Sequence, residues 1–238
     1  MAIAIDTTSQ SGAWNNAESS VTYSHTCNGS DRVLVVFVTN YAGAVTVSGI
    51  TYNGTALTQV GTRISYNSST RWVTAWVLIA PASGANNVVV TLSGTDYVRT
   101  MATSLTGAYQ TTQPNANSSL ASTASGTINQ SVTTTNTNML LWGVDTNATG
   151  TSGTGTILLG SGFGELRTHA STASVAAGSN ALQLTSVGAI FAGKLVAIEQ
   201  GAAAGPANVK TFNGLAIASV KTKNGLAIAS VKTQNGLA

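Results

Sequence analysis

Short runs of alternating apolar and polar residues, rich in Val, Ile and Thr, recur along most of the chain and are separated by Gly, Asn and Ser. A period of two is typical of β-strands, and the Asn-Gly and Ser-Gly pairs between the runs are typical of turns. No segment has a sustained helical period with capping residues at its ends. This pattern limits the fold to the all-β class.

The segments that fit strands best predict an antiparallel sandwich of two sheets, jelly-roll-like in kind. They are Ser20 to Thr26, Arg32 to Thr39, Gly61 to Tyr66, Arg71 to Ile79, Asn87 to Ser93, Val98 to Thr106, Gly126 to Thr134, Asn138 to Asp145, Thr156 to Leu159, Glu165 to His169 and Ile190 to Glu199. Asn53-Gly54 lies between two further short runs and predicts a β-hairpin. The polar segments 111–126 and 146–155 are predicted to be surface loops.

Composition agrees with this class, because only 7% of the residues are charged while 43% are hydrophobic. About 25% charged residues is usual in a soluble domain, and long helices depend on Glu, Lys and Arg. Disordered chains combine low hydrophobicity with high net charge, which this chain does not. No apolar run approaches the ~18 residues of a membrane-spanning helix, so no membrane partner is expected.

The net charge of +3 is divided unevenly along the chain. Residues 1–205 contain six basic and seven acidic residues, a net charge of −1, whereas the remainder contains four lysines and no acid, a net charge of +4. The main part of the chain therefore has no basic stripe, and no nucleic-acid partner is expected.

The C-terminus repeats the sequence VKTxNGLAIAS with a period of 11, beginning at Val209, Val220 and Val231, and the third copy stops at Ala238. Each copy contains the Asn-Gly pair that two-residue hairpin turns prefer. These predicted turns are Asn213-Gly214, Asn224-Gly225 and Asn235-Gly236.

An antiparallel meander is the favoured arrangement of the repeats. A hairpin closed at Asn224-Gly225 pairs Lys223 with Leu226 and Thr222 with Ala227. A stacked solenoid would instead align the repeat lysines in a ladder of like charges, which is destabilising. We therefore predict three regions: a sandwich body at 1–200, a Gly/Ala/Pro hinge at 201–208 and a β tail at 209–238.

A two- or three-stranded ribbon is marginal alone in water, and its open edges can pair with another chain. We expect the tail to dock on its own body, on a neighbouring subunit, or on both. The expected assembly interface consists of the larger apolar tail residues, namely Val209, Leu215, Ile217, Val220, Leu226, Ile228 and Val231.

No residue pattern predicts catalysis, a metal or a cofactor. His25 and His169 lie in no recognisable motif, and the seven acids form no local pair of the kind that glycosidases or metal sites use. The glycine-rich stretch 153–164 lacks the Lys-Ser/Thr end of a phosphate loop. Cys27 is the single cysteine, so an internal disulfide is excluded.

Aromatic residues are the candidates for ligand contact. Trp72 and Trp76 are four residues apart on one predicted strand and so share a face. With Tyr66 and Tyr97 they would make a platform for stacking sugar rings, although a place in the sandwich core is the more frequent role of such residues. Trp14 lies in a polar context and is the better candidate for an exposed contact.

Four segments in the middle of the chain resemble a β-sandwich module of secreted bacterial surface proteins and of phage structural proteins. They are Ile50–Thr58, Trp76–Gly84, Val88–Gly94 and Ser104–Gly107. The repeat sequence of the tail resembles repeats at the ends of tailed-phage proteins. These resemblances imply a structural role and bring no catalytic residues.

We therefore expect a non-enzymatic structural protein of a phage virion surface, either a capsid decoration or a fibre-like protein. Its partners would be copies of itself and other virion structural proteins. The N-terminus lacks the features of a signal peptide, which favours release by lysis as part of a virus particle over secretion. A carbohydrate-binding or adhesion module, and a subunit of an extracellular filament assembled by strand addition, are the alternatives, both placing the protein outside the cell or on its surface.

Overall fold

The computed structural model describes residues 1–12, 17–41, 43–66, 70–122, 126–146, 151–160, 166–187 and 191–202, and four two-residue strands nearer the C-terminus. The chain divides into two compact units, Ala2–Gly201, called the body here, and Ala202–Ala238 together with Met1. The secondary-structure elements within the described ranges are strands, and the ladders between them are antiparallel. The predicted all-β class is confirmed, and no helix in these ranges is long and apolar enough to cross a membrane.

The described ranges of the body contain seventeen strands in two groups. The first group is β1 (Ala4–Gln10), β2 (Ala17–Cys27), β3 (Val33–Asn40), β4 (Val47–Tyr52), β5 (Thr55–Ala56), β6 (Thr58–Gln59), β7 (Ile64–Tyr66), β8 (Arg71–Ile79) and β9 (Gly84–Thr106). The second group is β10 (Ala116–Ser122), β11 (Gly126–Thr134), β12 (Asn138–Thr146), β13 (Thr151–Ser152), β14 (Thr156–Leu159), β15 (Leu166–Ala170), β16 (Gly178–Val187) and β17 (Phe191–Glu199).

Most predicted strands occur close to their expected bounds, and three differences are informative. The strands β1, β10 and β16 were not predicted, because Ser, Thr, Asn and Gln alternate there with few large apolar residues. β10 lies inside the predicted loop 111–126, and the two-residue strand β13 lies inside the predicted loop 146–155. The two strands predicted on either side of Ser93-Gly94 form one continuous strand, β9.

The long strand β9 belongs to both parts of one sheet. Its first part pairs with β2 and β4, and its last part pairs with β1 and β3. The nine strands are joined through β9 into one hydrogen-bonded sheet with two parts. Outer sheet 1 is the part made of β2, β4, β5 and the first part of β9, and inner sheet 1 is the part made of β1, β3, β6, β7, β8 and the last part of β9. The second group forms inner sheet 2 (β10, β12, β14, β15, β17) and outer sheet 2 (β11, β13, β16).

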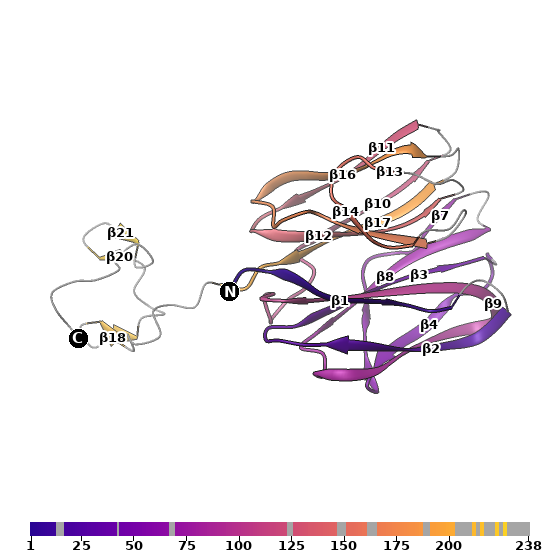
Figure 1. The fold of residues 1–238 in the computed structure, drawn as a ribbon, viewed down its shortest axis with the longest axis horizontal. Helices are drawn as coiled ribbons and strands as arrows, with labels where there is room; N and C mark the ends of the chain where they lie inside the picture. The colour runs from indigo at the N-terminus through magenta and orange to yellow at the C-terminus, as the bar shows by residue number, and fades with distance from the viewer. Residues whose placement is uncertain are drawn as a thin grey trace. The chain divides into compact units, whose positions relative to one another are not determined.

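The four sheets stack as layers, and three hydrophobic clusters fill the spaces between them (Figure 1). Leu34 and Ile50 belong to the cluster between outer and inner sheet 1, and Trp142 and Leu184 to the cluster between inner and outer sheet 2. The central cluster joins the two inner sheets. The predicted single sandwich of two sheets is thus corrected to two sandwiches packed face to face.

The inner strands explain this difference. β3 and β12 are buried along their whole length, and β17 along all but its last residue. A run that is apolar on both faces has no polar side to turn toward water, so each inner sheet must be covered twice. Alternation is seen in an outer strand such as β11, where exposed and buried residues follow each other from Thr127 to Thr134.

The second group of strands repeats the pairing pattern of the first. β1·β9, β2·β9, β3·β8, β3·β9 and β4·β9 correspond to β10·β17, β11·β16, β12·β15, β12·β17 and β13·β16. β3 and β12 are equivalent strands and lie against each other, since a Cβ added to Gly143 would stand 2.2 Å from Phe37 Cδ1. The body is therefore a duplicated sandwich whose two copies pack through the same sheet.

The strand directions give the body two distinct ends. β3 and β12 finish, and β8, β15 and β17 begin, at what we call the loop end. Both ends of the body's chain lie at the opposite end, called the terminal end. There the Ile3 amide donates to Gln200 Oε1 over 3.3 Å, and the Gly201 amide donates to the carbonyl of Gly107 over 2.8 Å.

Candidate functional site

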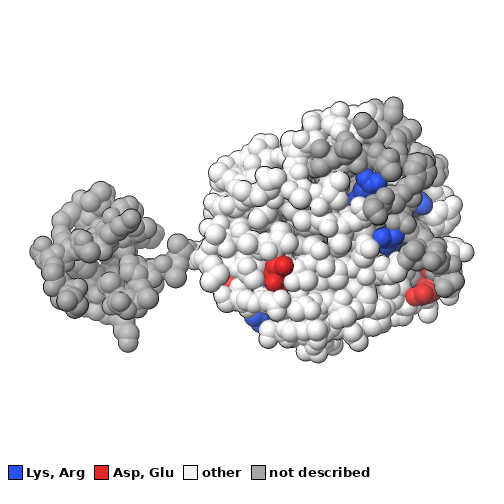
Figure 2. Space-filling model, viewed as in Figure 1, with Lys and Arg blue, Asp and Glu red and all other residues white. Residues whose placement is uncertain are grey.

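The basic side chains of the body gather toward the loop end. Five of its six basic residues lie in the strand segments next to that end or in the loop before β7, whereas Arg32 lies at the terminal end beside Pro81. These five are Arg63, Arg71, Arg99, Arg167 and Lys194. Figure 2 shows a face with very few charged side chains, on which most of the lysine and arginine lies at the right-hand end.

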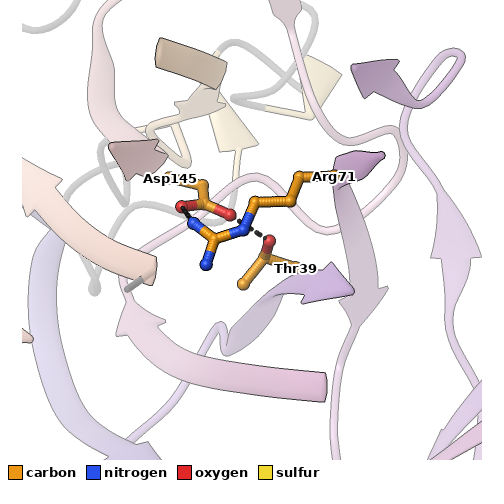
Figure 3. Close-up of polar contacts among 3 residues, drawn as sticks. All are labelled: Thr39, Arg71 and Asp145. Carbon is orange, nitrogen blue, oxygen red and sulfur yellow. Dashed lines mark hydrogen bonds and ion pairs between the residues drawn. The ribbon is translucent and has the colours of Figure 1, made fainter. Parts of the chain in front are cut away.

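A buried ion pair joins the two sandwiches at the loop end (Figure 3). Arg71 at the start of β8 contacts the fully buried Asp145 of β12, with 3.2 Å between Nη1 and Oδ1. The Thr39 hydroxyl donates to the other carboxylate oxygen of Asp145 over 2.5 Å. Since a buried carboxylate is costly unless it is paired and hydrogen-bonded, these contacts fix the Arg71 side chain in place.

Two exposed tyrosines lie next to this pair. The Tyr41 amide donates to the carbonyl of Tyr97 over 3.1 Å, so the two residues face each other across β3 and β9. Tyr41 is 51% exposed and Tyr97 is 44% exposed. The Arg71 guanidinium lies 5.4 Å from the centre of the Tyr41 ring, which is within the range of a cation–π contact.

The predicted tryptophan platform is not a shared exposed surface. Trp76 is 7% exposed and belongs to the core between outer and inner sheet 1, which is the alternative left open for it. Trp72 is partly buried, and the Arg63 guanidinium lies over its ring at 3.5 Å. Trp14 and the side chain of Tyr66 lie outside the described residues.

Lys194 is a buried cation between β10 and the loop before β7. It is 1% exposed, and its Nζ donates to Ser119 Oγ over 2.7 Å and to the carbonyl of Thr62 over 3.0 Å. Burial lowers the pKa of this amine. The bond to the Thr62 carbonyl holds the loop before β7 against the second sandwich, and so helps to shape the loop end.

Neither histidine is placed to act on a substrate. His25 is 1% exposed with Nδ1 2.8 Å from Ser9 Oγ, and His169 is fully buried against Trp142. Burial lowers the pKa of each to about 4, and a minor opposing effect of the Asp6 charge acts on His25. Within the described ranges, no three His, Cys, Asp or Glu residues stand close enough together to hold a metal ion.

The repeat tail is described at four short strands, β18 (Thr211–Phe212), β19 (Leu215–Ala216), β20 (Thr222–Lys223) and β21 (Leu226–Ala227). β20 and β21 pair Lys223 with Leu226 and Thr222 with Ala227, the two pairs expected for a hairpin at Asn224-Gly225. β18 and β19 pair in the same way one repeat earlier. The remaining predicted tail pairs, the turn residues and five of the predicted interface residues lie outside the described ranges; Leu215 and Leu226 are the two inside them.

Sequence reasoning missed Tyr41, Arg71, Asp145 and Lys194 as members of one region. Tyr41, Arg71 and Asp145 stand close to a strand end, where an apolar run meets polar residues, and Lys194 is the charged residue inside the apolar run of β17. Their proximity depends on the face-to-face packing of two sheets that are distant in sequence, which no local pattern reports.

No protein-family model, no curated protein sequence and no solved structure matches this chain. The resemblance to bacterial surface and phage structural proteins therefore stays a prediction.

Proposed function

We propose that this protein is a non-enzymatic structural component of a phage virion surface, a capsid decoration or fibre-like protein. The jelly-roll-like sandwiches of the body would be displayed, and the repeat tail would assemble with neighbouring subunits. The observation that carries the proposal is the pair of hairpin ladders in the tail, which repeat one register 11 residues apart in a unit separate from the body.

Strand edges give the tail its means of assembly. Each described tail ladder has two strands, so within those ranges every strand has one edge without a ladder partner. Unpaired edges are templates for strands of another chain, and isolated two-stranded ladders are marginal in water. Pairing with equivalent repeats of a second copy would give these edges partners and would add strands that stabilise the ladders.

The body's surface supports the same role. Only 7% of the residues are charged, and Figure 2 shows wide areas without any charged side chain. Surface charge normally keeps soluble proteins apart, so a surface of neutral Thr, Ser and Asn tolerates close packing between copies.

Deletion of residues 209–238 tests the assembly role. We expect the full chain to form oligomers in mass photometry and the shortened chain to remain a folded monomer with the far-UV spectrum of a β-sheet protein, since the described hydrophobic clusters are built from residues 3–198. A shortened chain that assembles as the full chain does would contradict the proposal. Immunogold electron microscopy of particles from the native source tests the location, and labelling of cell-attached filaments instead of virions would favour the filament alternative.

A further inference from the structure

Three side chains form a row across neighbouring strands at the loop end. Asn40 of β3 is paired with both Trp72 and Val98, so the next residue, Tyr41, stands opposite Arg71 on one side and Tyr97 on the other. Directly opposed residues in antiparallel strands put their side chains on the same face. At about 4.8 Å between strands, the row Tyr97–Tyr41–Arg71 is about 10 Å long.

The row lies on the face of inner sheet 1 that packs on the second sandwich further along. Phe37 of β3 and Met101 of β9 point into the central cluster, and Tyr41 and Tyr97 are an even number of residues away, so they continue that face. Their exposed fractions of 51% and 44% show that the second sandwich does not cover this part of it. The row is thus an exposed part of this face, and its third member, Arg71, also forms the ion pair with Asp145.

Exposure of these rings is not explained by folding. Among the described residues, the large apolar side chains that are exposed are Met1, Tyr41, Tyr97, Tyr109 and Ile157. Scattered single residues of this kind are normal, whereas Tyr41 and Tyr97 stand directly opposite each other on neighbouring strands and are exposed together. Contiguous exposed apolar surface of this kind is characteristic of binding sites. The ion pair holds the third member of the row rigid, which lowers the entropy lost on binding.

We propose that the row Tyr97–Tyr41–Arg71 binds an oligosaccharide, with sugar rings stacked on the two tyrosines and hydroxyl groups hydrogen-bonded by the tyrosine O–H groups. A protein partner needs about 800 Å² of contact with an apolar centre, far more than three side chains offer. A sugar ring has an apolar face and a polar edge, which matches the amphipathic tyrosine ring. The inference rests on the proposed function in one respect, the display of the body to the surroundings.

A glycan array of bacterial surface, plant and animal oligosaccharides, probed with the labelled full chain, tests the inference. We expect binding to at least one saccharide, and a loss of affinity of about tenfold or more in both Tyr41→Ala and Tyr97→Ala, as for central aromatic contacts in other interfaces. Tyr41→Phe retains the ring and should retain most of the binding.

Tyr109→Ala is the matched control, because Tyr109 is an exposed tyrosine at the terminal end, where its amide donates to the carbonyl of Glu199. Its binding should equal that of the unaltered chain. The inference would be overturned if Tyr41→Ala and Tyr97→Ala bound as tightly as the unaltered chain, or if the chain bound no saccharide at all. Capture of a protein receptor that depends on Tyr41 would also overturn it. Mass photometry of the same variants reports assembly separately, so a failure of the glycan site and a failure of the assembly role give different results.

Discussion

Burial keeps His25 and His169 neutral in the folded body. His169 has no hydrogen-bond partner at either ring nitrogen, and neither has Nε2 of His25. The pKa of each falls to about 4, against about 6.5 in an unfolded chain. Between these pH values the unfolded chain therefore binds more protons than the folded one, so stability falls as the pH falls.

We expect the free energy of unfolding in urea to drop by about 2 to 3 kcal/mol for each histidine between pH 7.5 and 4.5. Above pH ~6.5 these two groups contribute no pH dependence, and the loss is complete below the folded pKa. His169→Leu, which removes a ring without hydrogen bonds in an apolar setting, should reduce the drop by about half. An unchanged drop in that variant would show that His169 is not the titrating group.

At the scale of elements, the contact between β3 and β12 depends on a size match between equivalent residues. Phe37 on one strand fills the space that Gly143 leaves on the other. A second large side chain at either position would force the inner sheets apart, because packed cores have no spare volume. The duplicated sandwich can thus pack on itself only because its two copies differ at this point.

Gly143→Ala should destabilise the body by about 2 kcal/mol or more, since its Cβ would overlap the Phe37 ring. Gly49→Ala in β4 is the control, because a Cβ there meets no heavy atom within 4 Å, and its effect should stay within about 0.5 kcal/mol. Urea denaturation measures both. In combination with Phe37→Ala, the Gly143→Ala change should cost much less than alone, and strict additivity would contradict the proposed clash.

Local patterns predict the elements well where burial is one-sided or the apolar run is continuous. β8, β11 and β14 have the predicted bounds, because their β-branched residues and flanking turns specify a strand without help from the rest of the chain. β10 and β16 are strands because partners pair with them, and their own side chains are too polar to predict it.

Local sequence patterns also could not predict the duplication of the sandwich. β3 (VLVVFVTN) and the equivalent residues of β12, Met139 to Thr146 (MLLWGVDT), are identical only at Leu34/Leu140 and Val38/Val144. Apolar character is kept at most of these positions while the individual residues change, so pairing and burial repeat without a sequence repeat. The loop-end site shares this limit, since it requires the packing of both copies.

On the scale of the whole molecule, the central cluster makes the two sandwiches one cooperative unit. It draws on Val35 and Phe37 from the first sandwich and on Leu141 and Val196 from the second, all fully or almost fully buried. Separating the sandwiches would expose this cluster and break the buried pair of Arg71 and Asp145.

We expect a single thermal transition of the body, with equal calorimetric and van't Hoff enthalpies, and coincident changes in tryptophan fluorescence and far-UV circular dichroism. Trp76 lies in the first sandwich and Trp142 in the second, and Trp14 and Trp72 are the other two tryptophans of the chain. A variant that keeps Trp142 alone therefore follows the second sandwich, and Trp142→Phe removes the signal of that sandwich. Two resolved transitions, one for each sandwich, would show that the sandwiches unfold independently.

The position of Gly201 after β17 also determines how the body would respond to a mechanical force applied at its C-terminal end. Gly201 closely follows β17, which is paired along its length with β10 on one side and β12 on the other. If the loop end were attached to a surface, a pull on Gly201 would act along the axis of β17. The hydrogen bonds of both ladders would then be loaded together in shear, and would not break one at a time. A molecule attached at one end and pulled from the other would therefore resist unfolding through the geometry that joins its last strand to the rest.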